Sequence, residues 1–153
     1  MKKLFLLPLL IVTCFCYAQD AKKIIGKPVK IGNLLVAQFD FPKQMNWYDA
    51  KKACEALGIG WRLPTKSELN ILYKNRTKIG GFVKSKNKNE GYDSNKAYWS
   101  STTIDPIPKD AWIQIFEDGF QNITMKDFPF YVRAVYEVEI AHPRPMYSGP
   151  IPF

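Results

Sequence analysis

GWRLPTKSEL, the stretch from Gly60 to Leu69, decides how this 153-residue chain folds. Within it, Thr65-Lys66-Ser67-Glu68 is a capping box: the Thr65 hydroxyl accepts a hydrogen bond from the Glu68 amide, and the Glu68 carboxylate accepts one from the Thr65 amide. Pro64, just before the box, prevents the helix from extending backwards. The sequence therefore predicts a helix that begins after Thr65 and whose apolar face carries Leu69, Leu72 and Tyr73.

An earlier helix is predicted to begin after Asn46, a favoured N-cap residue, and to end at Gly58. Its apolar residues recur every three or four positions along one face, and they are Trp47, Ala50, Ala53, Cys54 and Leu57. We therefore expect Cys54 to be a small, buried core residue rather than a catalytic or redox-active thiol.

Two hairpins are predicted from their turn residues. Val29 to Gln38 contains two short strands around Gly32-Asn33, and Asp118-Gly119 joins a strand at Ala111–Phe116 to one at Phe120–Met125. Both pairs are expected to be antiparallel because such short turns reverse the chain.

Two more strands are predicted, at Ala97–Thr102 and at Phe130–Val138, where side chains alternate as they do in a sheet. The polar stretch Arg76–Lys96 is predicted to be a long surface loop. Two helices followed by a run of antiparallel strands indicate an α+β domain, in which the helices pack on small antiparallel sheets.

The first residues are typical of an export signal. Lys2 and Lys3 precede an apolar core from Leu4 to Cys16, which is shorter than the roughly 18 to 20 residues of a spanning helix, and Ala18 suits a signal peptidase. We expect cleavage after Ala18, hence an exported protein (periplasmic, secreted or cell-surface) with no stable membrane span. An uncleaved anchor, or a lipoprotein lipidated on Cys14 or Cys16, is the alternative.

The expected organisation is a signal peptide at residues 1–18, a leader at 19–28, one folded domain at 29–140 and a Pro-rich tail at 141–153. Of three cysteines, only Cys54 would remain after cleavage, so we expect the domain to fold without a disulfide. The formal net charge of +8 fits attraction to polyanions, or simply a soluble surface with scattered lysines.

Four further blocks accompany GWRLPTKSEL in fixed order: MNW at Met45–Trp47, YWSST at Tyr98–Thr102, Ala111-Trp112, and YVRAV at Tyr131–Val135. Together they resemble the bacterial C-type-lectin-like domains of the Lcl C-terminal-like family over roughly residues 29 to 136. RLPT followed by an acidic residue also recurs in formylglycine-generating enzymes and in major-paralogous-domain proteins, which the chain resembles more distantly. The resemblance implies a compact C-type-lectin-like fold, and it marks a fold rather than one activity.

We expect the motif residues to serve the scaffold, with Arg62 bridging backbone carbonyls or Glu68 and the hydroxyl residues satisfying backbone groups. The residues given this structural role are Trp61, Arg62, Thr65, Glu68, Trp99, Ser100, Ser101, Trp112 and Arg133.

Sugar-binding C-type lectins hold calcium with paired carboxylates and amides from a long loop. The corresponding connection here, Thr103 to Asp110, is short and lacks the Glu-Pro-Asn and Gln-Pro-Asp triplets. We therefore expect no calcium loop, no metal and no cofactor. The single histidine, His142, lies in the tail and no cysteine follows Cys54, which argues against an enzyme. No zinc finger or base-stacking motif indicates nucleic-acid binding.

The functional prediction is an exported binding or adhesion module for an extracellular protein or glycan, including a polyanionic glycan, without calcium. The alternatives are an enzyme on a scaffold like that of the formylglycine-generating enzymes, or a structural envelope protein. Because binding residues concentrate in loops on rigid scaffolds, the candidate ligand contacts are Lys84, Lys86, Lys88, Tyr92, Asp105, Lys109 and Asp110.

Overall fold

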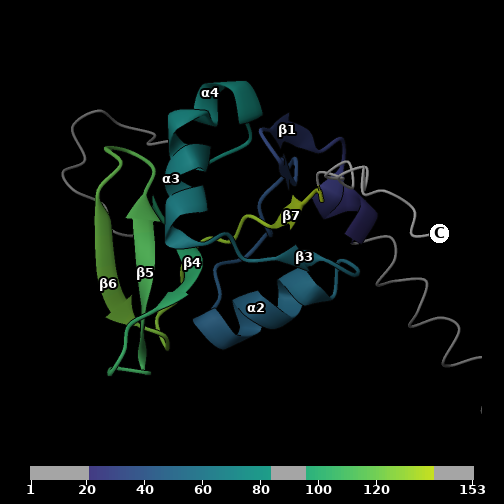
Figure 1. Cartoon of the computed structure of the whole chain (residues 1–153). Coiled ribbons are helices and arrows are strands. Elements are labelled where there is room, and N and C mark those ends of the chain that lie inside the picture. The colour runs from purple at the N-terminus through teal and green to yellow at the C-terminus, as the bar shows by residue number, and fades with distance from the viewer. Residues whose placement is uncertain (1–20, 84–95, 140–153) are drawn as a thin grey trace, which may run out of the picture.

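The computed structural model describes residues 21–83 and 96–139 (Figure 1). The helices in this part of the chain are α2 (Trp47–Glu55), α3 (Lys66–Lys74) and α4 (Arg76–Ile79), together with a helical turn at residues 21–25. The strands are β1 (Val29–Ile31), β2 (Leu34–Val36), β3 (Trp61–Arg62), β4 (Ala97–Thr103), β5 (Asp110–Ile115), β6 (Gln121–Met125) and β7 (Val135–Glu137).

The strands form two antiparallel sheets, which confirms the α+β prediction. The first has the order β1-β2-β7-β3 and the second the order β4-β5-β6. β7 lies between β2 and β3, so the last described strand is paired with the early hairpin and with the start of the GWRLPTKSEL stretch. The two ends of the domain are thereby joined in one sheet.

Of the two helices predicted from the sequence, α3 packs on the second sheet, and α2 lies beside β3 of the first sheet and also contacts β4. α3 contacts β4 and β5, whereas α2 contacts β3 and β4 (Figure 1). Asn46 caps α2 by accepting a hydrogen bond from the Asp49 amide at 2.9 Å, and Thr65 caps α3. Both helices therefore begin where the capping residues predict.

β4 separates two hydrophobic clusters, because neighbouring side chains on a strand point to opposite faces. Trp99 packs in one cluster with Cys54, Leu63 and Ile113, while Tyr98 packs in the other with residues of α3. Both Tyr98 and Trp99 are fully buried. This strand therefore lies at the centre of the domain, and both helices are positioned against it.

The strand predicted at 130–138 is wrong over most of its length. Phe130 and Tyr131 make only isolated bridges, to Met45 and to Tyr98, and the regular strand is limited to β7. The expected alternation also fails, because Arg133 is completely buried between buried Val132 and Ala134. The chain crosses from one sheet to the other here, so both of its sides face the core.

Two segments predicted to be irregular are partly ordered. Arg76–Ile79, within the predicted surface loop, forms α4 and buries Ile79. Residues 21–25, within the predicted leader, are helical and bury Ile24 in the first cluster. β3, which pairs with β7, has no counterpart among the predicted strands. Among the described helices, none is long and apolar enough to span a bilayer.

Candidate functional site

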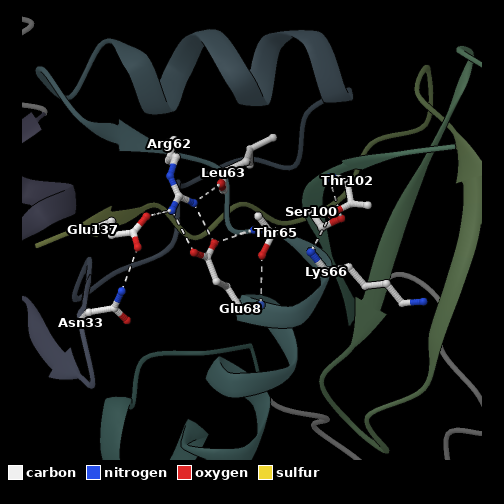
Figure 2. Close-up of polar contacts among 9 residues, drawn as sticks. All are labelled: Asn33, Arg62, Leu63, Thr65, Lys66, Glu68, Ser100, Thr102 and Glu137. Carbon is white, nitrogen blue, oxygen red and sulfur yellow. Dashed lines mark hydrogen bonds and ion pairs between the residues drawn. The ribbon is translucent and has the colours of Figure 1, made fainter. Parts of the chain in front are cut away.

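The GWRLPTKSEL stretch forms a polar clamp around Arg62 (Figure 2). The Arg62 guanidinium donates two hydrogen bonds to the Glu68 carboxylate, from Nη1 to Oε2 at 2.7 Å and from Nη2 to Oε1 at 2.8 Å. It also donates to the Leu63 carbonyl at 3.2 Å and to the Glu137 carboxylate at 3.1 Å. Arg62 thereby connects β3, α3 and β7.

Glu68 has little capacity left for a ligand. Its Oε2 also accepts from the Thr65 amide at 2.7 Å, and its own amide donates to the Thr65 hydroxyl at 3.2 Å, so the capping box is complete. Burial raises the pKa of Glu68, but the hydrogen bonds from Arg62 and Thr65 outweigh burial and the net pKa is lowered. The carboxylate is therefore a charged structural acceptor.

The hydroxyl residues of YWSST connect α3 to β4. The Thr102 hydroxyl accepts from the Lys66 amide at 2.9 Å, and the Ser100 hydroxyl accepts from the Thr102 amide at 3.2 Å (Figure 2). The Ser101 amide donates to the Pro64 carbonyl at 2.7 Å. These groups satisfy backbone donors and acceptors, as expected for scaffold residues.

A second arginine pair lies deeper in the domain. Arg133 Nε donates to Asp40 Oδ1 at 2.6 Å, and the Tyr98 hydroxyl donates to Asp40 Oδ2 at 2.6 Å. Arg133 Nη1 also donates to the carbonyls of Ala37, Gln38 and Gly80. Burial raises the pKa of Asp40, and burial together with the neighbouring Asp40 charge raises the pKa of Tyr98. This network is a brace that joins three segments in the interior of the domain.

The tryptophans of the motif blocks are also used by the scaffold. Trp99 donates its Nε1–H to the Met45 carbonyl at 2.9 Å, and Trp61 packs on Tyr136 with ring centroids 5.9 Å apart. Trp112 is half-buried beneath the Lys66 ammonium, which lies 3.0 Å from the ring centroid. Of these three, Trp112 lies on the more open part of the β4-β5-β6 sheet, opposite exposed Ile123 on β6.

Three segments meet at the end of this sheet, around Lys126. The Trp47 amide donates to the Lys126 carbonyl, and the Lys126 amide donates to the Lys109 carbonyl, each at 2.9 Å. The Lys126 ammonium donates to the Pro108 carbonyl and lies 4.3 Å from the Trp47 ring centroid. Lys126 is only 6% exposed, so it ties the 104–109 connection, the end of β6 and the start of α2 together.

Large apolar side chains project to solvent around this junction. Tyr48 is 47% exposed, Ile107 50%, Met125 52% and Phe128 46%. Tyr48 borders Lys126, Ile107 lies in the 104–109 connection, and Met125 and Phe128 flank the turn after β6. We call these four residues, with exposed Lys109, the sheet-end surface, beneath which the buried Lys126 lies.

The candidate ligand contacts fall into two groups. Asp105 and Lys109 are exposed in the 104–109 connection, and Asp110 is half-buried at the start of β5, paired with Met125. All three therefore lie at the sheet end. Lys84, Lys86, Lys88 and Tyr92 lie outside the described residues.

Sequence reasoning named Lys109 but missed the four apolar members of this surface: Tyr48, Ile107, Met125 and Phe128. Tyr48, Met125 and Phe128 are distant from the 104–109 connection in sequence, so no local pattern brings them together with it. The exposed Met125 at the end of a predicted strand was the available signal, but alternation alone does not tell which face is covered.

Cys54 is fully buried in the first cluster, and burial strongly raises the pKa of its thiol. No group of three or more His, Cys, Asp or Glu side chains suited to hold a metal ion occurs among residues 21–83 and 96–139. The exposed groups of the sheet-end surface can bind by contact and hydrogen bonding.

Comparison with known proteins agrees with this architecture. The family model described as "Lcl C-terminal domain" matches residues 21–136, and it begins within the segment predicted to be a leader. The crystal structure of botrocetin, a C-type-lectin-like protein, superposes with a TM-score of 0.50 at 10% sequence identity, covering 74% of this chain and 98% of that chain. At this identity the similarity shows the fold alone, and it confirms the C-type-lectin-like prediction. No curated protein matches the chain.

Proposed function

This chain belongs to the Lcl C-terminal domain family, and on that basis we propose that it is an exported, non-catalytic binding module. Its ligand is an extracellular protein or glycan, recognised without calcium. The observation that carries this proposal is the sheet-end surface, where four large apolar side chains remain about half exposed on a rigid junction.

The composition of this surface supports binding rather than solvation. Aromatic and methionine side chains are enriched in protein interfaces, and clustered exposed apolar residues mark interaction sites. Tyr48 and Phe128 could also stack on the apolar face of a sugar ring, whereas Ile107 and Met125 suit a protein partner. The exposed ammonium of Lys109 adds a donor for carboxylate or sulfate groups.

The junction beneath the surface supports ready-formed binding. Lys126 is buried and bonded to backbone groups of two other segments, so the surrounding loops are held in place before a ligand arrives. A preorganised surface loses less conformational entropy on binding, which increases affinity.

The non-catalytic part of the proposal rests on how the titratable groups are used. Glu68 is bonded to Arg62 and Thr65, Asp40 is bonded to Arg133 and Tyr98, and the Cys54 thiol is buried. General acid–base or nucleophilic catalysis needs such groups within reach of a substrate. An exposed binding surface needs none of them.

The test is binding of the purified protein to a glycan array and to a panel of extracellular proteins, followed by affinity measurement on each ligand found. The variant Tyr48→Ser/Phe128→Ser should lose about tenfold or more in affinity, because central aromatic contacts dominate interfaces. Ile71→Ser is the matched control, since Ile71 is exposed on α3 away from this surface, and it should bind like the parent.

Two further arms separate the kinds of ligand. For a polyanionic glycan, affinity should fall steeply with salt, because exposed charges are screened within about 10 Å at 0.1 M ionic strength. A variant in which Lys84, Lys86 and Lys88 are neutralised together tests the candidate contacts in the loop predicted at Arg76–Lys96. Binding that requires calcium, or that survives loss of Tyr48 and Phe128, would refute the proposal for this surface.

A further inference from the structure

A second surface feature lies on the other half of α2. A hollow of about 640 Å³ opens between the helical turn at residues 21–24, the segment 39–45 and the C-terminal half of α2. The apolar side chains that line it include Ile24, Phe39, Phe41, Met45, Ala53 and Leu57. We call this hollow the α2 groove.

The groove is built on the hydrophobic core. Ile24 belongs to the first cluster, and Phe41, Met45 and Leu57 are partly buried against it. Phe39, at the rim, is 47% exposed. The volume lies within the range of about 300 to 1,000 Å³ that is usual for small-molecule sites, and such sites are mostly apolar with a few polar groups.

The charged groups of the described lining favour an anionic ligand. Lys23 and Lys43 are exposed at the groove and form no ion pair with any described residue. The one carboxylate of the described lining, Asp40, is bonded to Arg133 at 2.6 Å and so is already neutralised by a partner. An apolar cavity with two ammonium groups that have no ion-pair partner among the described residues complements a ligand that has an apolar chain and an anionic end.

We propose that the α2 groove binds a single-chain fatty acid, with its alkyl chain against Phe41, Met45 and Leu57 and its carboxylate near Lys23 and Lys43. The alkyl chain gains free energy by leaving water, and the lysines select the negative head group. This site is separate from the sheet-end surface and does not depend on the binding function proposed for it.

The direct experiment is calorimetric titration of the purified protein with octanoate, decanoate and dodecanoate below their critical micelle concentrations. Affinity should rise about fourfold for each added methylene, since burying one methylene is worth about 0.8 kcal/mol. Dodecyltrimethylammonium, which has the same chain length and a positive head group, should bind at least tenfold more weakly than dodecanoate.

Variants locate the site. Ala56→Phe, at an exposed lining position at the end of α2, should fill the groove and weaken dodecanoate binding tenfold or more. Lys23→Glu/Lys43→Glu should reverse the preference for the negative head group. Lys30→Glu/Lys52→Glu is the charge-matched control, because both lysines are exposed and neither lines the groove, and it should bind like the parent.

Thermal unfolding of each variant shows whether its fold is intact. The proposal is overturned if dodecanoate does not bind, if affinity is independent of chain length, or if folded Ala56→Phe binds as well as the parent. Association with phosphatidylglycerol vesicles in the absence of dodecanoate binding would also overturn it. Tyr48→Ser/Phe128→Ser should leave dodecanoate binding unchanged, so failure here and failure of the sheet-end surface are distinguishable.

Discussion

The two arginine–carboxylate pairs of this domain have similar shortest distances, but Arg62 donates two hydrogen bonds to Glu68, whereas Arg133 donates one to Asp40. Arg62 and Glu68 meet at 2.7 Å with 34% and 16% of their side chains exposed, whereas Arg133 and Asp40 meet at 2.6 Å with 0% and 14% exposed. The pKa of Glu68 is lowered, and the pKa of Asp40 is raised. At both carboxylates burial is the largest single influence on the pKa. The hydrogen bonds and charges that lower the pKa outweigh burial only at Glu68.

The shortest distance between the two groups therefore does not by itself determine what an ion pair contributes. The Arg62 pair lies at the edge of the first sheet, where solvent lowers the cost of holding two charges. The Arg133 pair lies between the two hydrophobic clusters, where desolvating the charges costs more and losing one partner leaves the other unpaired. The first pair therefore stabilises a local contact, whereas loss of the second pair is expected to destabilise the whole fold.

The largest effect is expected at the buried pair. Arg133→Met should lower the free energy of unfolding by about 3 to 5 kcal/mol, because it leaves the Asp40 carboxylate buried without its partner. It also removes the hydrogen bonds that Arg133 Nη1 donates to the carbonyls of Ala37, Gln38 and Gly80. Urea denaturation measures the loss, and Arg62→Met should lose clearly less. Equal losses at the two arginines would contradict the comparison.

The next effect is expected at Glu68, whose carboxylate serves both the clamp and the capping box. Glu68→Ala should cost about 2 kcal/mol, since it removes a charge-assisted pair and one helix-cap bond. Glu137→Gln is the control, because Glu137 meets the same arginine at 3.1 Å but is 53% exposed, and it should cost no more than about 0.5 kcal/mol. Denaturation of both variants under the same conditions makes the comparison.

A smaller loss is expected at the other half of the capping box. Thr65→Ala should cost about 1 kcal/mol, the usual worth of an N-cap bond, and should leave ligand affinity unchanged because Thr65 is remote from both proposed sites. Thermal unfolding and a binding titration measure the two quantities. Weakened binding at unchanged stability would place Thr65 in a binding site.

The pH dependence should differ in sign between the pairs. Since the pKa of Glu68 is lowered in the folded state, its contribution is present above its unfolded pKa and is lost as the pH falls through the folded value. Since the pKa of Asp40 is raised, protonation of Asp40 favours the folded state as the pH falls. On acidification, Glu68→Gln should therefore lose less stability than the parent, and Asp40→Asn should lose more. Denaturation between pH 6 and pH 3 measures how the stability of each variant changes with pH relative to the parent. Changes of slope with the same sign in the two variants would refute the assignment.

The features that could be predicted from the sequence alone are local ones. The capping box at Thr65 and Glu68, the N-cap at Asn46 and the hairpin turn at Asp118-Gly119 depend on residues that are close in the chain, so their patterns predict the elements that form. The five sequence blocks likewise indicated the family and the C-type-lectin-like fold, and both were confirmed. The placement of Asp105, Lys109 and Asp110 at a common end of the sheet also follows from their closeness in sequence.

Contacts between residues that are distant in sequence became known only from the folded structure. Arg133 lies in an alternating stretch that predicts a strand, yet it is completely buried because residues 132–134 pass between two clusters and bond to a segment about a hundred residues earlier. The sheet-end surface similarly joins Tyr48 of α2 to the turn after β6 through the buried Lys126. Periodicity reports which side of an element faces inward, but the burial of a charge and the exposure of an apolar patch depend on which other segments cover it.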